Sequence, residues 1–261
     1  MIEVENITNQ IINADCMDIL KQLPDKCIDL VLTDPPYNIS QKNFCVDRSK
    51  CKSPIMRRNK AINFDFGDWD NMERQEFLEF TKTWFLECVR VLKDGGTLIS
   101  FYNKEDISYL GWLGMDNNMR TRTIFTWHKT NPVPSFRKVN YLSACEFAWI
   151  GSKGDKTWTF NFGYQKEMHN FYETSNKSCY AETEHPTEKP KTLIKHLIGI
   201  HSNENDLILD CFSGSGTTAV ACHNLNRRFI CIEKDKDYFD ASVERLKNAQ
   251  AQMKLDLFAV S

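Results

Sequence analysis

The sequence predicts a three-layer α/β fold built around a mostly parallel β-sheet. Two short apolar runs, residues 29–33 and 206–210, each stop at an acidic residue and a turn-forming segment. Continuous apolar runs of this length are typical of strands that are buried on both faces, as in a parallel sheet. Between the two runs, segments with helical spacing alternate with strand-like segments. This alternation predicts crossover connections that place helices on both faces of the sheet.

The other elements follow from spacing and turn residues. Apolar residues recur at helical spacing from Met72 to Leu92, and the pair Gly95-Gly96 is expected to end that helix. A helix that carries Pro190 in its first turn is expected to run to about His201. Further strands are predicted at 97–101, 122–127, 146–150 and 228–233, and further helices directly after residue 216 and from about 238 to 249.

Length, composition and cysteine usage indicate one globular domain in a reducing compartment. The 261 residues are 41% hydrophobic and 26% charged, so we expect a single domain over residues 1–261. The poorly periodic segments 41–70 and 151–184 are expected to be loops or small insertions. The ten cysteines are scattered, and no secretory signal or long apolar stretch occurs. We therefore expect a cytoplasmic protein with no metal site and no membrane span.

The segment after the second apolar run has features of a site for an adenosine-type cofactor. Gly214 and Gly216 allow the backbone to come close to a ligand because they have no Cβ. Glu233 ends the next predicted strand, where a carboxylate can accept hydrogen bonds from ribose hydroxyls. The stretch 214–219 also fits the loose dinucleotide pattern G-x-G-x-x-G/A, so a nicotinamide-dependent oxidoreductase is an alternative at this point.

The tetrapeptide Asp34-Pro35-Pro36-Tyr37 follows the first apolar run, and its chemistry suits an exocyclic amino group. The amino nitrogen of adenine is a poor nucleophile because its lone pair is delocalised into the ring. Hydrogen bonds from its protons to the Asp34 carboxylate and the Pro35 carbonyl would favour a tetrahedral, reactive nitrogen. The prolines fix the backbone and lack competing N–H groups, and Tyr37 offers a ring for an extruded base. A rigid turn is the alternative for this tetrapeptide alone.

Both segments are expected at the carboxyl ends of parallel strands, where such sheets bind ligands at a switch in strand order. The two loops should therefore meet, and their combination favours the catalytic interpretation of both.

Together these motifs resemble the DNA amino-methyltransferases, specifically the β group, in which D-P-P-Y precedes the cofactor motif. Here Asp34 to Tyr37 precedes Asp210 to Thr217. The resemblance covers most of the chain and implies a Rossmann-like, S-adenosylmethionine-dependent methyltransferase fold. It also implies direct, in-line transfer of a methyl group to N6 of a flipped-out adenine in double-stranded DNA.

The resemblance further implies which residues contact the cofactor. The segment at Asp15-Cys16 is similar to the one that contacts the cofactor's adenine, and residues 185–190 match H-P-T-x-K-P, which holds its methionine carboxylate. Phe212 is implied to pack near the cofactor and Glu233 to hold its ribose. The implied cofactor residues are Asp15, Cys16, Thr187, Lys189, Asp210, Phe212, Gly214, Ser215, Gly216, Thr217 and Glu233.

DNA contacts are expected from basic segments and from residues 127–132, which resemble a family segment near the DNA and the target base. Residues 41–60 hold seven basic side chains against one acidic one, a pattern that suits phosphates and equally suits a solvated loop. Segments 41–70 and 151–184 are the expected target-recognition regions. The predicted DNA-binding residues are Arg57, Arg58, Lys129, Asn131 and Arg137.

Four other functions are alternatives to this one. Methylation of the cytosine N4 amino group is the nearest, but cytosine enzymes more often carry Ser where this chain has Asp34. A nicotinamide-dependent oxidoreductase is supported only by the glycine pattern, and intact Asp34 disfavours a binding module that has lost catalysis. No Pro-Cys dipeptide occurs, so a cytosine-carbon methyltransferase has no candidate nucleophile. A homodimer and a cognate restriction endonuclease are left open as further partners.

Overall fold

The computed structural model describes residues 2–38, 45–46, 62–63, 72–134, 138–175 and 188–260, with side chains for all except 45–46, 62–63 and 254–260. The chain divides into two compact units. The larger unit comprises residues 1–35 and 84–261, and the smaller comprises residues 36–83.

An eight-stranded sheet forms the centre of the larger unit, with strand order β1-β10-β9-β2-β5-β7-β6-β8. Strand β7 runs antiparallel to both of its neighbours, β5 and β6, whereas all other neighbouring pairs are parallel. The strands are β1 (Gln10–Asn13), β2 (Ile28–Thr33), β5 (Leu92–Tyr102), β6 (Met119–Lys129), β7 (Cys145–Lys153), β8 (Phe171–Thr174), β9 (Leu207–Asp210) and β10 (Arg228–Glu233). The predicted α/β fold with a mostly parallel sheet is thus confirmed.

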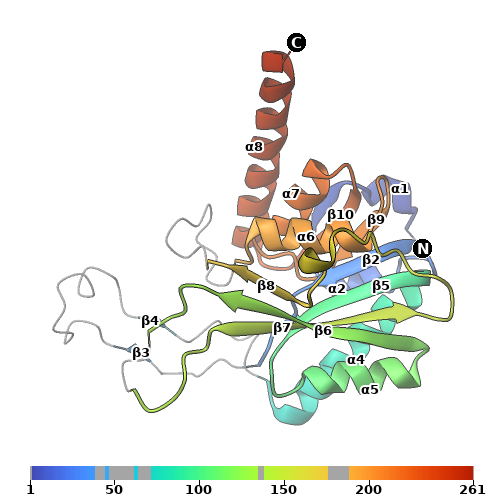
Figure 1. Cartoon of the computed structure of the whole chain (residues 1–261). Helices are drawn as coiled ribbons and strands as arrows, with labels where there is room; N and C mark the ends of the chain where they lie inside the picture. Colours follow the sequence, from blue (N-terminus) through green and yellow to red (C-terminus); the bar gives the residue numbers. More distant parts are fainter. Residues whose placement is uncertain are drawn as a thin grey trace. The chain divides into compact units, whose positions relative to one another are not determined.

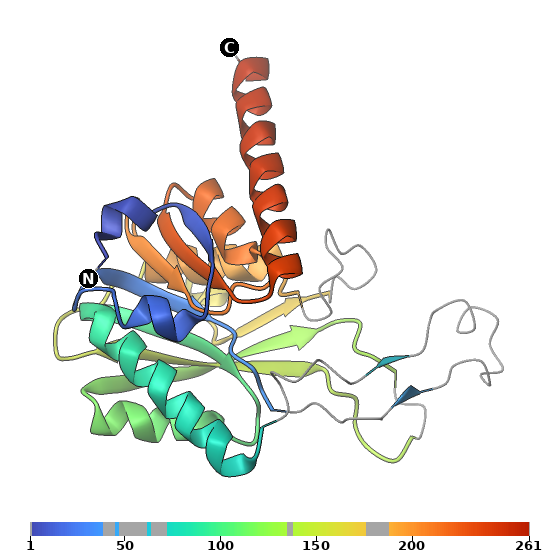
Figure 2. The same cartoon turned by 180° about the vertical axis from the view of Figure 1, so that it is seen from behind.

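Helices cover both faces of this sheet (Figures 1 and 2). Helix α5 and the part of α4 that belongs to this unit lie on one face, and α6, α7 and α8 lie on the other. The helices are α1 (Val4–Ile7), α2 (Cys16–Leu20), α4 (Arg74–Val91), α5 (Ile107–Asp116), α6 (Lys191–His201), α7 (Thr217–Asn224) and α8 (Lys236–Val260), with a short 3-10 helix η3 (Gln165–Glu167). Among the described residues, none of these helices combines the length and apolar character that crossing a bilayer requires.

The core on the α4/α5 face is organised around Trp149 of β7, which is fully buried. Its ring packs against Phe85 of α4, with centroids 5.6 Å apart, and its Nε1 donates to Thr121 Oγ1 at 3.0 Å. A Cβ on Gly114 of α5 would come within 3.1 Å of this ring, and one on Gly151 would overlap it at 2.1 Å. Glycine at these positions therefore lets a large indole lie flat between the helix and the sheet.

The smaller unit contains a two-stranded antiparallel sheet, β3 (Cys45–Val46) with β4 (Ile62–Asn63), and the 74–83 part of α4. The Asn38 side chain accepts a hydrogen bond from Met72 N at 2.7 Å and donates to Met72 O at 2.9 Å. These two bonds fix the chain before α4 to the chain after Tyr37.

One predicted helix end was wrong. Gly95-Gly96 does not end a helix but lies inside β5, which begins at Leu92 directly after α4. A Cβ on Gly95 would lie 2.8 Å from Thr157 O, and a Cβ on Gly96 would lie 3.0 Å from Asp29 O. The pair therefore serves the close approach of β5 to neighbouring backbone. The last helix also runs to Val260, beyond the predicted end at about 249.

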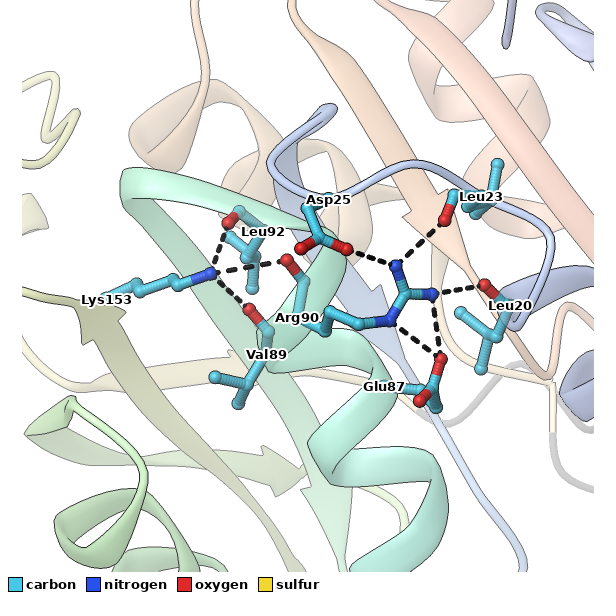
Figure 3. Close-up of polar contacts among 8 residues, drawn as sticks. All are labelled: Leu20, Leu23, Asp25, Glu87, Val89, Arg90, Leu92 and Lys153. Atoms are coloured by element: carbon cyan, nitrogen blue, oxygen red, sulfur yellow. Dashed lines mark hydrogen bonds and ion pairs between the residues drawn. The ribbon is translucent and has the colours of Figure 1, made fainter. Parts of the chain in front are cut away.

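Lys153, at the end of β7, caps the end of α4 (Figure 3). Its Nζ donates to Val89 O at 2.5 Å and to Leu92 O at 2.7 Å, with Arg90 O at 3.3 Å. A helix leaves its last carbonyls without intrahelical partners, and a cation placed there satisfies them and offsets the helix dipole.

Arg90 also holds the end of α4, through contacts with the segment after α2 (Figure 3). Its guanidinium donates to Leu20 O at 2.7 Å and to Leu23 O at 2.9 Å, next to the end of α2. It also pairs with Asp25 at 2.6 Å and Glu87 at 2.8 Å. The turn that leads into β2 is therefore held to the end of α4.

We expect Lys153→Met to lower the free energy of unfolding by about 1–3 kcal/mol, because the aliphatic stem is kept while the buried carbonyls lose their donor. Urea unfolding monitored by circular dichroism measures this. Lys156→Ala, which changes an exposed lysine nearby, is the control and should leave stability unchanged within about 0.5 kcal/mol. Equal stability of both variants would contradict the capping role.

Candidate functional site

The two predicted motif loops begin side by side at one edge of the sheet, at Asp34 and at Asp210. Strands β2 and β9 are parallel neighbours, with Leu30 opposite Ile208 and Val31 opposite Leu209. Both therefore end at the same edge, β2 just before Asp34 and β9 at Asp210. A buried hydrogen bond from Thr33 Oγ1 to Asp210 Oδ1, 3.0 Å long, joins the two strand ends directly.

Asp210 organises the turn that follows β9. It is almost fully buried and accepts hydrogen bonds from Thr218 Oγ1 at 2.5 Å and Phe212 N at 3.2 Å, besides that from Thr33. Burial raises its pKa to about 6; the hydrogen bonds counteract part of this rise, and the negative charge of Asp34 adds to it. The carboxylate thus braces the turn and lies close enough to Asp34 to feel its charge.

The turn between β9 and α7, residues 211–216, is called the glycine turn, and its conformation requires glycine at two positions. Gly214 and Gly216 have φ angles of +48° and +74°, in the left-handed region, and a Cβ on Gly216 would come within 2.8 Å of Ser242 Cβ in α8. Gly214 N donates to Glu233 Oε2 at 2.7 Å, and Asp235 N donates to Glu233 Oε1 at 2.8 Å. The carboxylate at the end of β10 therefore holds the turn after β9, and burial raises its pKa.

Two further buried residues clamp this turn. Arg245 of α8 donates to Ser215 O at 3.1 Å, to Ser215 Oγ at 3.2 Å and to Thr217 Oγ1 at 2.9 Å. The same guanidinium pairs with Glu188, just before α6, at 2.6 Å. Both charged side chains are buried, so the pair satisfies two groups that would each be costly to bury alone.

Asp15 and Cys16 lie at the same edge of the sheet, after β1, which pairs with β10. Asp15 caps α2 by accepting from Met17 N at 3.0 Å, and it pairs with Lys234 at 2.9 Å. Partial burial would raise the pKa of Asp15, but these two partners outweigh it and lower the pKa. Cys16 is buried, and burial raises the pKa of its thiol, so the group is neutral.

Phe212, near the start of the glycine turn, packs against α4. Its ring meets Trp84 edge-to-face, with centroids 6.0 Å apart. The adjacent Cys211 Sγ lies 3.6 Å from Cys88 Sγ of α4. These contacts fix the start of the turn against the opposite helix layer.

A chain of four alternating charges extends from Asp34 along the same edge. Lys189, just before α6, contacts Asp34 Oδ2, and its Nζ lies 3.2 Å from Glu146 Oε2 at the start of β7. Glu146 Oε1 in turn pairs with Lys129 Nζ, at the end of β6, at 2.5 Å. Because β7 runs opposite to β6, its first residues meet the last residues of β6 here.

Both central members of this chain are charged. Burial alone would lower the pKa of Lys189, but Asp34 and Glu146 outweigh it and raise that pKa above its ordinary value. Burial alone would raise the pKa of Glu146, but the charges of Lys189 and Lys129 lower it. The two ion pairs therefore stabilise each other's charges.

The remaining predicted residues are placed as follows. Pro35 follows Asp34 in the larger unit and is buried, whereas Pro36 and Tyr37 belong to the smaller unit. Asn131 is exposed after β6. Thr187, Arg57, Arg58 and Arg137 lie outside the described residues.

The edge suits an organic ligand. Within the described part of the chain, no group of three or more His, Cys, Asp or Glu side chains is placed to hold a metal ion. Ser213 Oγ in the glycine turn is buried and has no hydrogen-bond partner among the described residues. An unsatisfied buried hydroxyl beside left-handed glycines and a carboxylate is the donor and acceptor set that a nucleoside would use.

Comparison with known proteins identifies the family. The family model N6_N4_Mtase, described as DNA methylase, matches residues 28–244. The chain belongs to the N6/N4 DNA methylase family. It is 28% identical over 261 residues to the type II methyltransferase M.HinfI of Haemophilus influenzae, covering 94% of this chain and 70% of that protein. It is 30% identical over 255 residues to the type II methyltransferase M.HpaI of Haemophilus parainfluenzae, covering 91% and 74%.

Solved structures confirm the methyltransferase fold. The M1.HpyAVI–SAM complex is similar with a TM-score of 0.68 and 29% identity, covering 91% of this chain and 98% of that one. The PvuII DNA methyltransferase, which is cytosine-N4-specific, has a TM-score of 0.68 at 18% identity, covering 92% and 90%. At this level of identity, the similarity to the PvuII enzyme shows a shared fold only. Family membership decides for methyl transfer and against the hydride transfer that the glycine pattern also allowed.

Sequence reasoning missed Glu146 and Arg245 and gave Glu188 no role. Glu146 was recognised only as the first residue of a predicted strand, although a charged residue entering a buried strand is itself a signal. Arg245 lies in the predicted last helix, where its spacing does not distinguish it from solvent-facing residues. Its role depends on a partner about 30 residues away, and on Glu188.

The stability of this methylase should depend on pH through Asp210. Between its ordinary pKa of 3.8 and about 6, the folded protein keeps a proton on this group that the unfolded chain has lost. The contribution of Asp210 to stability is therefore present at low pH and is lost as the pH rises through 6. We expect the stability of the wild type, relative to Asp210→Asn, to fall by about 1–3 kcal/mol between pH 4 and pH 7.

Urea unfolding of both proteins at several pH values measures this difference. Groups other than Asp210 contribute equally to the two curves and cancel. Parallel curves across the whole range would show that Asp210 does not titrate in this window.

Proposed function

We propose that this methylase transfers a methyl group from S-adenosylmethionine to N6 of an adenine that is flipped out of double-stranded DNA. The attack is direct and in line, without a covalent enzyme intermediate. The proposal depends on one observation above all: Asp34 and the glycine turn follow neighbouring parallel strands, whose ends are joined by the Thr33–Asp210 hydrogen bond.

S-adenosylmethionine supplies a methyl group made electrophilic by its positively charged sulfur. Glu233 would accept hydrogen bonds from the ribose, in addition to those it accepts from Gly214 N and Asp235 N. Asp15 and Cys16 would contact the adenine ring of the cofactor, and Thr187 with Lys189 its carboxylate. The similar protein M1.HpyAVI has been solved as a complex with SAM, which supports this cofactor.

Asp34 would accept a hydrogen bond from one amino proton of the target base, and the Pro35 carbonyl would accept the other. The contact with Lys189 fixes the orientation of the carboxylate. Pro36 restricts the backbone, and Tyr37 would stack on the extruded base. Holding the two reactants at attack distance contributes up to several kcal/mol to the lowering of the barrier.

The choice of adenine rests on Asp34, since cytosine-N4 enzymes more often carry Ser before Pro-Pro. The fold does not separate the two bases, because the cytosine-N4-specific PvuII enzyme shares it. Methylation of cytosine N4 is therefore the second candidate. Mass spectrometry of nucleosides from DNA treated with the enzyme should show N6-methyladenine, and N4-methylcytosine in its place would overturn the choice of base.

We further propose that residues 1–261 form one catalytic domain in which segments 41–70 and 151–184 recognise the target. Lys129 and Asn131 would act near the target base, and Arg57, Arg58 and Arg137 on the DNA. Lys129 is mostly buried and paired with Glu146, which suits a place near the base better than one on an outer phosphate. We also propose a cytoplasmic role in restriction–modification beside a cognate endonuclease; the similar proteins M.HinfI and M.HpaI are named type II methyltransferases.

We expect Asp34→Ala to lower the rate of methyl transfer at least about 100-fold while S-adenosylhomocysteine still binds, because the lost acceptor acts on the base and not on the cofactor. Transfer of radiolabelled methyl groups and titration calorimetry measure the two properties. Asp116→Ala, on the exposed surface of α5, is the matched control and should retain full activity. Normal turnover by Asp34→Ala would refute the assignment.

We expect Glu233→Gln to weaken S-adenosylhomocysteine binding by about 10- to 100-fold, because charged hydrogen bonds to the ribose are worth about 1.5–3 kcal/mol. Calorimetry measures the affinity. Glu244→Gln, which changes an exposed carboxylate on α8, should bind as the wild type does. Equal affinities for both variants would remove Glu233 from the cofactor site.

A further inference from the structure

Glu146 is a half-buried carboxylate that belongs to none of the motifs discussed above. It is the second residue of β7 and lies opposite Trp127 of β6, so both side chains lie on the same face of the sheet. Its Oε1 pairs with Lys129 at 2.5 Å, and its buried Oε2 lies 3.2 Å from Lys189 Nζ. Glu146 therefore places one negative charge between the two ammonium groups of Lys129 and Lys189.

Glu146 matters because its charge makes the sum of the four charges zero. The two carboxylates, Asp34 and Glu146, cancel the two ammonium groups, Lys129 and Lys189. Without the charge of Glu146, the group would carry one excess positive charge in a region that is largely buried. In such surroundings a unit charge acts strongly on its neighbours, because there is little water to screen it.

The proposed reaction creates positive charge at this place. The lone pair of the amino nitrogen forms the new N–C bond, the electrons of the broken C–S bond stay with sulfur, and one amino proton then leaves to water. Until that proton leaves, the nitrogen beside Asp34 is positively charged. An uncompensated Lys189 would oppose this charge, whereas a neutral group of four would not.

We propose that Glu146 is a positioning residue for methyl transfer, which offsets the charge of Lys189 and holds its ammonium group at Asp34. This rests on the proposed function. Glu146 does not act as the base that removes the amino proton, because both of its oxygens face ammonium groups, which disfavour protonation. The ion pair of Lys189 with Asp34 serves methyl transfer only while the charges around it sum to zero.

The test is a charge-rescue cycle measured by single-turnover methyl transfer, with wild type, Glu146→Gln, Lys129→Met and the double variant. Glu146→Gln leaves an excess positive charge and should be slower by about tenfold or more. The double variant restores neutrality around Asp34 and Lys189, and its single-turnover rate should exceed that of Glu146→Gln. All rates are compared at saturating S-adenosylmethionine and DNA, because Lys189 and Lys129 are also proposed to contact these two substrates.

A merely structural role for Glu146 predicts the opposite pattern, in which removing a second partner makes the double variant slower still. Glu146→Asp keeps the charge on a shorter side chain and gives a second readout, because it should be faster than Glu146→Gln. If Glu146→Gln fails to fold, the rate of Glu146→Asp is compared with that of the double variant in its place. The inference is overturned if Glu146→Gln matches wild type, or if the double variant is no faster than Glu146→Gln. Either result, with an active wild type and an inactive Asp34→Ala, leaves the proposed function intact. A wild type that methylates no amino group refutes the proposed function instead.

Discussion

The parallel pairing of β2 with β9 is the constraint on which the site depends. These strands are separated by more than 170 residues in the chain, yet Thr33 Oγ1 and Asp210 Oδ1 share a buried hydrogen bond. Because parallel strands end at the same edge, pairing them places the segment after each strand beside the other. A different strand order would keep both motifs intact and separate their chemistry. Catalysis in this chain is therefore a property of sheet topology as much as of any one side chain.

Much of this arrangement could be predicted from the sequence because its signals are local. A buried strand that ends at an acidic residue, a left-handed glycine turn and a rigid Asp-Pro-Pro-Tyr segment each have a physical signature within a few residues. The predictions failed where the cause was distant. Gly95-Gly96 was assigned to a helix end, although it is needed where β5 approaches the backbone at Asp29 and Thr157. Short elements such as β1, α2 and β8 have too few residues for a detectable period.

Buried charges show the same division between local and distant causes. The partners of Glu146 come from two other segments, Lys129 and Lys189, and those of Arg245 from the glycine turn and from Glu188. These partners are too far apart in the sequence to be recognised from a local motif. The reversal of β7 is what brings Glu146 to the carboxyl edge, and that direction of the strand could not be deduced from composition. Charged residues inside apolar elements are the one trace that such networks leave in a sequence.

Glu188 and Lys189 are consecutive residues with different attachments. One is tied through Arg245 to the turn that begins α7, and the next contacts the carboxylate after β2. A single peptide bond, stiff and planar, is thus all that separates the anchor of the glycine turn from the partner of Asp34. A substitution that shifts the backbone at residues 188–189 would therefore disturb the clamp on the glycine turn and the ion pair at Asp34 together.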